Sequence, residues 1–458
     1  MLPPASETAP ARDVRPAVAA RPELAQALLD RGLGERRAYG MLVELLEVAP
    51  KRLAGSPGYE AAARWAERTM QDIGLANVRM EPVMAPHWER GDPERASARL
   101  ADGSALELSA CALGGSPAGS VTAPAVELNG LAALAELEAA GGSLQGRIVF
   151  LNQRMNPAAR SSFQAYGGAA GQRTRGPALA AKLGAVGVVI RSLSSADDDV
   201  PHTGMTRFED AGPKIPALAL GVQSAERLSA ALAAGKVESV TLETHCRELA
   251  DREQWNVVGE IAGSKWPEEV VVLGAHLDAW ETGDGAHDDG AGCTHVLEAA
   301  RLLLACGVAP LRTVRVVLFA NEENGLAGGR GYAEAHAGEA HFVLIESDSG
   351  GGTPRGLGLS VDEHVLERLR PAGAPLAAIA AERVSGGGGG ADIGPMAERA
   401  GAPEGSLSVD DTRYFDLHHS ANDVLESVHP RQLELGAVVL AYWAAVLADL
   451  GPGELSYN

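Results

Sequence analysis

Four segments in the second half of the chain run from apolar residues directly into acidic or histidine side chains. They are 270–273 with His276 and Asp278, 314–320 with Glu322-Glu323, 342–345 with Asp348, and 414–417 with His419. Apolar runs of this length are typical of strands buried on both faces of a sheet. The carboxyl ends of parallel strands meet at one edge, where α/β proteins bind their ligands. The pattern therefore favours an α/β fold with a polar site along one sheet edge.

From Asn256 onward, strand-like and helix-like segments alternate. The predicted elements are strands 257–261, 270–273, 314–319 and 342–345, and helices 291–306, 326–337 and 430–450. This alternation predicts a mixed, mostly parallel sheet sandwiched by helices. The run Gly386–Gly390 is predicted to be a loop, because consecutive glycines do not hold regular structure.

The sequence pattern of the first half of the chain changes after residue 90, which predicts an inserted domain. Helical periodicity over 22–48 and 59–73 is followed by a strand at 77–83, and after residue 90 short strands and glycines become frequent. We therefore expect four parts. They are a disordered N-terminal tail (1–21), the first part of the main domain (22–89), a small inserted α/β domain (90–251), and the second part of the main domain with the site (252–458).

The charge and cysteine content exclude several classes of protein. Lys and Arg number 39 against 60 Asp and Glu, a formal charge of −21 that repels nucleic-acid phosphates. The four cysteines form no CxxC pair, so we expect neither a disulfide scaffold nor a thiolate metal site. We find no apolar run of membrane-spanning length. The N-terminus lacks the pattern of a signal peptide, which favours the cytoplasm.

His276 and Asp278 are spaced so that both side chains lie on the same side of an extended segment. A lone histidine at a strand end is more often a core residue, but a carboxylate two residues on can orient its imidazole, as metal-bound histidines need. Asp288-Asp289 precedes Gly-Ala-Gly, where a helix is expected to begin. Asp289 fits an acidic N-cap, and Asp288 is the candidate for a carboxylate that bridges two metal ions.

The adjacent Glu322 and Glu323 could form a solvated strand end, but at a buried sheet edge they need cations to compensate them. One glutamate could then bind metal while the other accepts a proton from water. Asp348 could equally be a turn former, and His418 competes with His419 as the second imidazole. Two imidazoles and three carboxylates suit a pair of zinc ions, which accept nitrogen and oxygen ligands.

Further segments complete a resemblance over about residues 25–450. They are Arg52-Leu-Ala-Gly-Ser-Pro-Gly, Pro201-His-Thr-Gly204, Pro213-Lys-Ile-Pro216, Glu260-Ile-Ala-Gly-Ser-Lys265, His276-Leu-Asp-Ala-Trp280, Gly285-Ala-His-Asp-Asp-Gly290, Glu346-Ser-Asp348 and His418-His-Ser420. Their order and spacing resemble the carboxypeptidase Q (plasma glutamate carboxypeptidase) group of di-zinc, co-catalytic metallopeptidases. The resemblance implies a zinc-peptidase/phosphorylase-like catalytic domain, a protease-associated-type insert that caps the site, and a homodimer.

The resemblance also implies a role for each site residue. These roles are His276 and Asp348 on one zinc, Glu323 and His419 on the other, Asp288 bridging the two, Glu322 as general base, and Asp278 in support of His276. Related enzymes place the ligand directly before Ser or Thr and four residues ahead of Asp, which selects His419 over His418. Candidate substrate contacts are His202, Asp392 and Tyr414. The loop before Asp392 departs from the group, whose members carry charged or hydroxyl residues there.

These features predict a peptidase for short peptides, with unblocked dipeptides as the expected substrates because the insert limits access. Hydroxide bridging two zinc ions would attack the scissile carbonyl, with Glu322 as the base. The alternatives are an aminopeptidase with the same centre, a non-catalytic binding module on the same fold, and a single-zinc cyclising acyltransferase. The complete ligand set weighs against the last two. Members of the group are usually exported, so an exported location stays the alternative to the cytoplasm.

Overall fold

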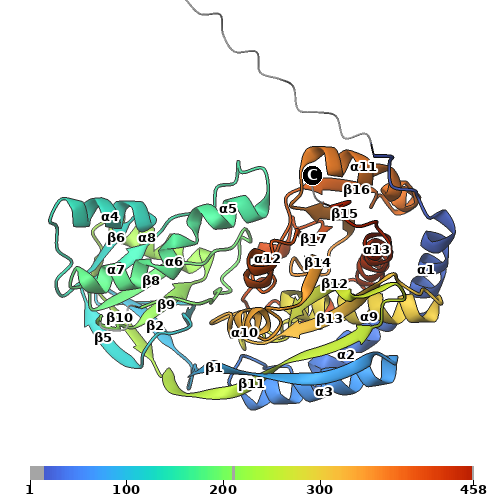
Figure 1. Ribbon diagram of the computed structural model, residues 1–458. Helices are drawn as coiled ribbons and strands as arrows, with labels where there is room; N and C mark the ends of the chain where they lie inside the picture. Colours follow the sequence, from blue (N-terminus) through green and yellow to red (C-terminus); the bar gives the residue numbers. More distant parts are fainter. Residues whose placement is uncertain (1–14, 209–211, 456–458) are drawn as a thin grey trace, which may run out of the picture.

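The computed structural model describes residues 15–208 and 212–455, which form a larger and a smaller body side by side (Figure 1). The larger body is built on an eight-stranded sheet. Its strands, in order across the sheet, are β1 (Ala76–Glu89), β11 (Arg247–Ile261), β13 (Arg312–Phe319), β12 (Trp266–His276), β14 (Ala340–Glu346), β17 (Glu404–Val409), β15 (Pro354–Leu359) and β16 (Arg383–Gly386). The centre, from β13 through β12 and β14 to β17, is parallel. The outer pairs β1–β11, β11–β13 and β15–β17 are antiparallel, so the predicted mixed sheet is confirmed.

Helices cover both faces of this sheet. Successive side chains of a strand point to opposite faces, so Val271 and Leu273 of β12 join one apolar cluster and Val270 and Val272 join the other. The helices on the first face are α1 (Pro22–Glu35), α2 (Arg37–Val48), α3 (Pro57–Ile73), α9 (Ala291–Ala305), α11 (Glu363–Gly373) and α13 (Pro430–Ala448). The helices on the second face are α10 (Ala327–Ala335) and α12 (Gly394–Ala400).

Helix α13 has the length and apolar composition of a membrane span, a feature the sequence analysis did not anticipate. It is 19 residues long, and 89% of its most apolar window is buried inside the larger body. It contributes an almost unbroken run of core residues from Leu433 to Leu447. Its apolar character is therefore that of a central core helix, and among the described residues it is the one helix that meets these criteria.

The N-terminal segment departs from two predictions. The helix expected over 22–48 is split at Arg36, whose left-handed backbone (φ 51°) ends α1 and begins α2. Residues 15–21, expected to belong to a disordered tail, are held on the larger body: the N–H of Val18 donates to the carbonyl of Arg368 at 2.8 Å, and Arg21 pairs with Asp449 at 2.7 Å. That part of the expectation is corrected, and residues 1–14 lie outside the described residues.

The smaller body contains two sheets packed together. One has the order β3 (Ala105–Leu108), β2 (Arg95–Leu100), β10 (Val237–Thr244), β5 (Gly119–Ala123), and the other the order β4 (Ala110–Ala112), β9 (Ala217–Leu220), β8 (Gly187–Arg191), β7 (Ile148–Leu151), β6 (Ala125–Leu128). Its helices are α4 (Gly130–Ala139), α5 (Ser162–Ala169), α6 (Gly171–Thr174), α7 (Gly176–Lys182) and α8 (Val222–Ala233). The chain enters and leaves this body through the long β1–β11 pair at the edge of the large sheet (Figure 1).

Arg52, at the start of the segment before α3, fixes the loop that follows β12. Its side chain is fully buried. The guanidinium donates hydrogen bonds to the carbonyls of Leu277, Asp284 and Gly285, at 2.8, 2.6 and 2.6 Å. Charged hydrogen bonds of this kind are stronger than neutral ones. The loop that carries several candidate site residues is therefore tied to the N-terminal part of the same body.

Replacing Arg52 with Met should lower the free energy of unfolding by about 3–5 kcal/mol, because three buried carbonyls lose a charged donor. Urea titration measures the change. The control is Arg64→Met, which removes an exposed pair with Glu60 on α3 and should change stability by no more than about 0.5 kcal/mol. Equal effects of the two substitutions would contradict the structural role of Arg52.

Candidate metal centre

The five predicted metal ligands come together at the carboxyl ends of the central parallel strands. His276 ends β12, Glu323 follows β13 and Asp348 follows β14. These three strands are neighbours in the sheet, so their ends meet at one edge. Asp288 lies in the turn before α9, and His419 in the segment after the short helix Tyr414–Asp416. Every one of these ligands is buried except Asp348, which is partly exposed.

Asp288 lies between the two imidazoles. Its Oδ1 is 3.2 Å from Nε2 of His276, and its Oδ2 is 3.3 Å from Nε2 of His419. On one side, His276 Nε2 is also 3.6 Å from a carboxylate oxygen of Asp348. On the other, His419 Nε2 is 2.9 Å from a carboxylate oxygen of Glu323. The donor atoms thus form two groups that share the Asp288 carboxylate, one oxygen in each.

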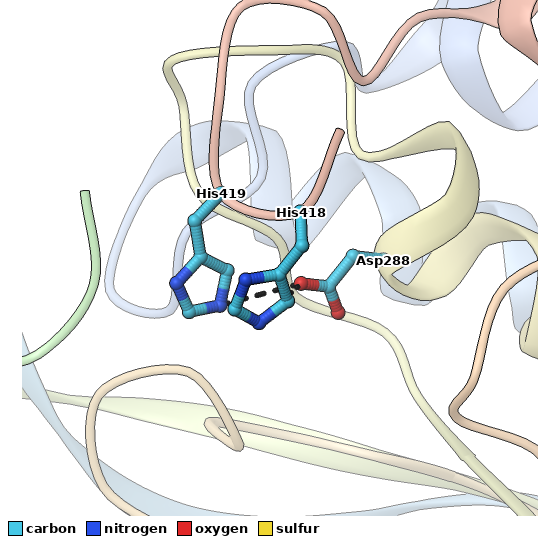
Figure 2. Close-up of side chains that lie close together, drawn as sticks. All are labelled: Asp288, His418 and His419. Carbon is cyan, nitrogen blue, oxygen red and sulfur yellow. Dashed lines mark ion pairs between the residues drawn. The ribbon is translucent and has the colours of Figure 1, made fainter. Parts of the chain in front are cut away.

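His418 lies against the same carboxylate as His419, as Figure 2 shows. Its Nε2 is 3.6 Å from Asp288 Oδ2, and its ring stacks on that of His419 with centroids 3.5 Å apart. Asp288, His418 and His419 together could also hold a cation. His419 differs from His418 because it contacts Glu323 as well. The geometry therefore favours His419 as the imidazole of the second group.

Asp278 contacts His276 through its backbone carbonyl and not, as expected, through its carboxylate. The Nδ1 of His276 is 3.0 Å from the backbone carbonyl of Asp278 and 3.7 Å from its carboxylate. A carbonyl only accepts, so Nδ1 carries the proton and Nε2 is left with a free lone pair. The Asp278 carboxylate instead accepts the backbone N–H groups of Glu322 and Glu323, at 3.0 and 3.3 Å. Asp278 therefore orients the imidazole through its backbone and the two glutamates through its side chain.

Two further aspartates hold the ligand loops in place. Asp289 accepts the N–H of Gly292 at 3.0 Å, in the first turn of α9, from one residue before the N-cap position Gly290, and it also accepts the N–H of His276 at 3.2 Å. Asp423 accepts the backbone N–H groups of His287 and Asp288, at 2.7 and 3.0 Å. In the sequence, Asp423 stands out only by its spacing, four residues after His419. No pattern in the sequence indicates that it holds the opposite loop.

The carboxyl groups at this edge of the sheet have shifted pKa values, as expected of a site that binds cations. Burial, with the nearby Asp348 and Glu323 carboxylates, raises the pKa of Glu322 well above its ordinary value. Burial, followed by the Asp288 carboxylate, raises the pKa of Glu323 to about 7. Asp288 behaves oppositely, because contacts with His276 and His419 outweigh burial and hold its pKa well below the usual range. Crowded buried carboxylates with imidazole nitrogens directed between them fit divalent cations, which would offset the repulsion.

A cavity of about 340 Å³ opens onto the centre between the two bodies. Its lining includes Phe163, Tyr166, Arg173, Thr174, Met205, Arg207, Asp288, Glu322, Glu323, Leu326, Asp348, Ala391, Tyr414, Phe415, His418 and His419. The larger body supplies the carboxylates and the histidines. The smaller body supplies two arginines and an aromatic wall. A volume of this size is within the range of sites for small molecules.

Of the three candidate substrate contacts, the structure places only Tyr414 on the cavity. Asp392 is fully buried. Two residues earlier, Gly390 packs so closely on Glu346 that a Cβ on it would lie 2.1 Å from the Glu346 carboxyl carbon. His202 is also buried, and its Nδ1 lies 2.7 Å from the carbonyl of His418. Neither residue belongs to the cavity lining, so both substrate contacts stay predictions. His202 contacts the backbone of the histidine segment.

Comparison with known proteins agrees with this geometry. Residues 256–444 match the model of peptidase family M28. Carboxypeptidase Q of Mus musculus is 33% identical over 447 residues, covering 96% of this chain and 92% of that protein. The solved structure of a peptidase M28 precursor from Shewanella amazonensis has a TM-score of 0.88 at 34% identity, covering 94% of this chain and 97% of that one.

A zinc aminopeptidase from Bacillus subtilis shares the fold, with a TM-score of 0.62 at 19% identity over 88% of this chain and 93% of that one. These matches show that the chain belongs to peptidase family M28. Within that family it is a carboxypeptidase Q-like metallo-exopeptidase, since the similarity to carboxypeptidase Q spans nearly the whole length of both chains.

Removing divalent metal should lower the thermal midpoint by about 5–10 °C, because a metal present at roughly a thousand times its dissociation constant stabilises the folded state by about 4 kcal/mol. Differential scanning calorimetry before and after 1,10-phenanthroline treatment and dialysis measures the shift, and added Zn²⁺ should reverse it. Asp288→Asn is the control, whose midpoint should no longer respond to the chelator. Identical midpoints of the wild-type protein with and without chelator would contradict a metal centre here.

Proposed function

We propose that this protein is a di-zinc exopeptidase that hydrolyses short peptides, above all unblocked dipeptides. The observation that carries the proposal is the Asp288 carboxylate, which offers one oxygen to each of two ligand groups. In this assignment His276 and Asp348 hold one zinc, Glu323 and His419 hold the other, and Asp288 bridges them. Nitrogen and oxygen donors of this kind suit zinc, and the fold is shared with a zinc aminopeptidase from Bacillus subtilis.

When bound, the two cations would polarise the scissile carbonyl and lower the pKa of water. Glu322 has no metal-binding role in this assignment, so its carboxylate is free to accept the proton of the attacking water and pass it to the departing amine. Its place in the lining of the cavity that Asp288 and Asp348 also line supports that role. The backbone of Glu322 is anchored by Asp278, so the base is held in a fixed position.

We also propose that residues 90–251 form an inserted domain of the protease-associated type, which restricts the site to short substrates. Two observations support it: this part of the chain has its own apolar clusters, and helices α5 and α6 bring Phe163, Tyr166 and Arg173 to the cavity.

We propose in addition that the protein is a homodimer, as the resemblance implies. Strand β1 is an edge of the large sheet and carries Met84, an apolar side chain that is 59% exposed and that a second copy could cover. The molecular mass measured by light scattering tests whether the protein is a dimer.

The second candidate is an aminopeptidase that acts on longer peptides with the same centre. A substrate panel separates the two: L-alanyl-L-alanine and longer alanine peptides against aminoacyl anilides, each with and without chelator. We expect chelator-sensitive hydrolysis of the dipeptide and about two zinc ions per chain by atomic emission. Faster hydrolysis of anilides and long peptides would establish the aminopeptidase instead. One zinc per chain, or no hydrolysis at all, would contradict both.

Glu322→Gln should lower kcat by about 10²–10⁴-fold while the zinc content is unchanged, because the substitution removes the base and leaves the ligands. Steady-state kinetics on the dipeptide and metal analysis give the two readings. The matched control is Glu334→Gln on the exposed side of α10, which should behave as wild type. Near-normal turnover of the Glu322 variant would remove this residue from the role.

A further inference from the structure

Arg173 is a buried cation without an acidic partner among residues 15–208 and 212–455. Its side chain is 7% exposed and belongs to α6, in the wall of the cavity. Its Nη2 donates to the hydroxyl of Tyr166 at 2.7 Å, and its Nη1 is 3.5 Å from the carbonyl of Thr203. Its Nε is buried and has no hydrogen-bond partner among the described residues. A guanidinium has five N–H groups, so most of its donors are left over.

His419 cannot satisfy these donors. Its Nδ1 is 3.4 Å from Nη1 of Arg173 and 3.3 Å from the carbonyl of Thr203. Its Nε2 is directed at Asp288 and Glu323, as a ligand atom would be. Nδ1 is then the protonated nitrogen and donates to the Thr203 carbonyl. Arg173 and His419 therefore present donors to each other, and burying a guanidinium in this way is unfavourable until an anion arrives.

The backbone beside Arg173 leaves room for this arrangement. Gly204 has a positive φ of 126°, and a Cβ at that position would lie 2.4 Å from Nη1 of Arg173 and 2.7 Å from Nδ1 of His419. Only glycine therefore allows the guanidinium and the imidazole to lie side by side. This accounts for the glycine of the segment Pro201-His-Thr-Gly204, to which the sequence analysis gave no chemical role.

We propose that Arg173 binds the free α-carboxylate of the peptide substrate and so selects peptides that end one residue beyond the scissile bond. The inference rests on the proposed dipeptidase function and deepens it. A planar guanidinium matches a carboxylate in geometry and charge. The carboxylates proposed to bind metal line the same cavity and belong to the larger body. The scissile carbonyl is thus placed at the metal centre while the terminal carboxylate is held by the smaller body.

The same cation has one rival role, stabilisation of the negative charge that develops on the scissile carbonyl oxygen. That role would help every substrate equally, whereas carboxylate recognition helps only peptides with a free C-terminus. Two substrates that differ in this group alone, L-alanyl-L-alanine and L-alanyl-L-alanine amide, distinguish the two.

The experiment compares kcat/KM for these two substrates in the wild type and in Arg173→Met. We expect the wild type to prefer the free acid, and the variant to lose about 10²-fold on the acid, chiefly through KM. Its activity on the amide should change by less than about threefold. Arg173→Lys should recover part of the preference, because the ammonium group keeps the positive charge but cannot form two parallel hydrogen bonds to the carboxylate. Arg175→Met, at an exposed position two residues away, is the control and should match the wild type.

Binding in an inactive background gives a second reading that does not depend on turnover. Calorimetry of L-alanyl-L-alanine with Glu322→Gln, and with the same protein carrying Arg173→Met, should show a Kd at least about tenfold weaker in the double variant. Zinc content and thermal midpoint of each variant report on the integrity of the centre.

The outcomes separate the two proposals. An equal loss on acid and amide, or an unchanged preference in Arg173→Met, overturns the role of Arg173 and leaves the dipeptidase intact. A wild-type protein that hydrolyses neither substrate overturns the proposed function, and the calorimetric comparison then decides on Arg173 by itself. Equal Kd values in the two backgrounds count against the inference in either case.

Discussion

The centre depends on one carboxylate placed between two imidazoles. The Asp288 carboxylate lies among other acidic groups, and contacts of its two oxygens with the imidazoles of His276 and His419 offset the repulsion. Asp423 holds its backbone in place by accepting the N–H of Asp288. The arrangement requires that β12, β13 and β14 end at the same edge, because His276, Glu323 and Asp348 come from those ends. The layered core of the larger body therefore serves the site directly, by fixing where three strands stop.

The smaller body completes the site from the other side. The N–H of Thr203 donates to the carbonyl of His419 at 2.9 Å, and His202 forms a bridge with Ser420. The segment with the second imidazole is thus supported by residues more than two hundred positions earlier in the chain. The same loop provides the space in which Arg173 lies against His419. In the function proposed here, metal binding and substrate recognition would therefore share one structural element between the bodies.

Much of this arrangement could be predicted, since the strands and helices of the larger body carry strong periodicity. The predicted helix 291–306 and strand 314–319 agree closely with α9 and β13. The break at Arg36 could not be predicted, because a left-handed arginine has no local signature. Burial of Asp392 escaped prediction for a different reason: its segment is fixed by contacts distant in sequence, such as the hydrogen bond from the N–H of Ile393 to the Glu346 carboxylate.

The sequence by itself determined which residue types end the central strands, because hydrophobic periodicity and the polar residues that follow it are local properties. It also determined the family, through the order and spacing of many short motifs. Only the tertiary structure decided which atoms meet: that Asp278 orients His276 through its carbonyl, that Asp423 holds the opposite loop, and that Arg173 is buried with the Tyr166 hydroxyl as a hydrogen-bond partner. Those are contacts between distant parts of the chain, and their geometry depends on how the two bodies pack.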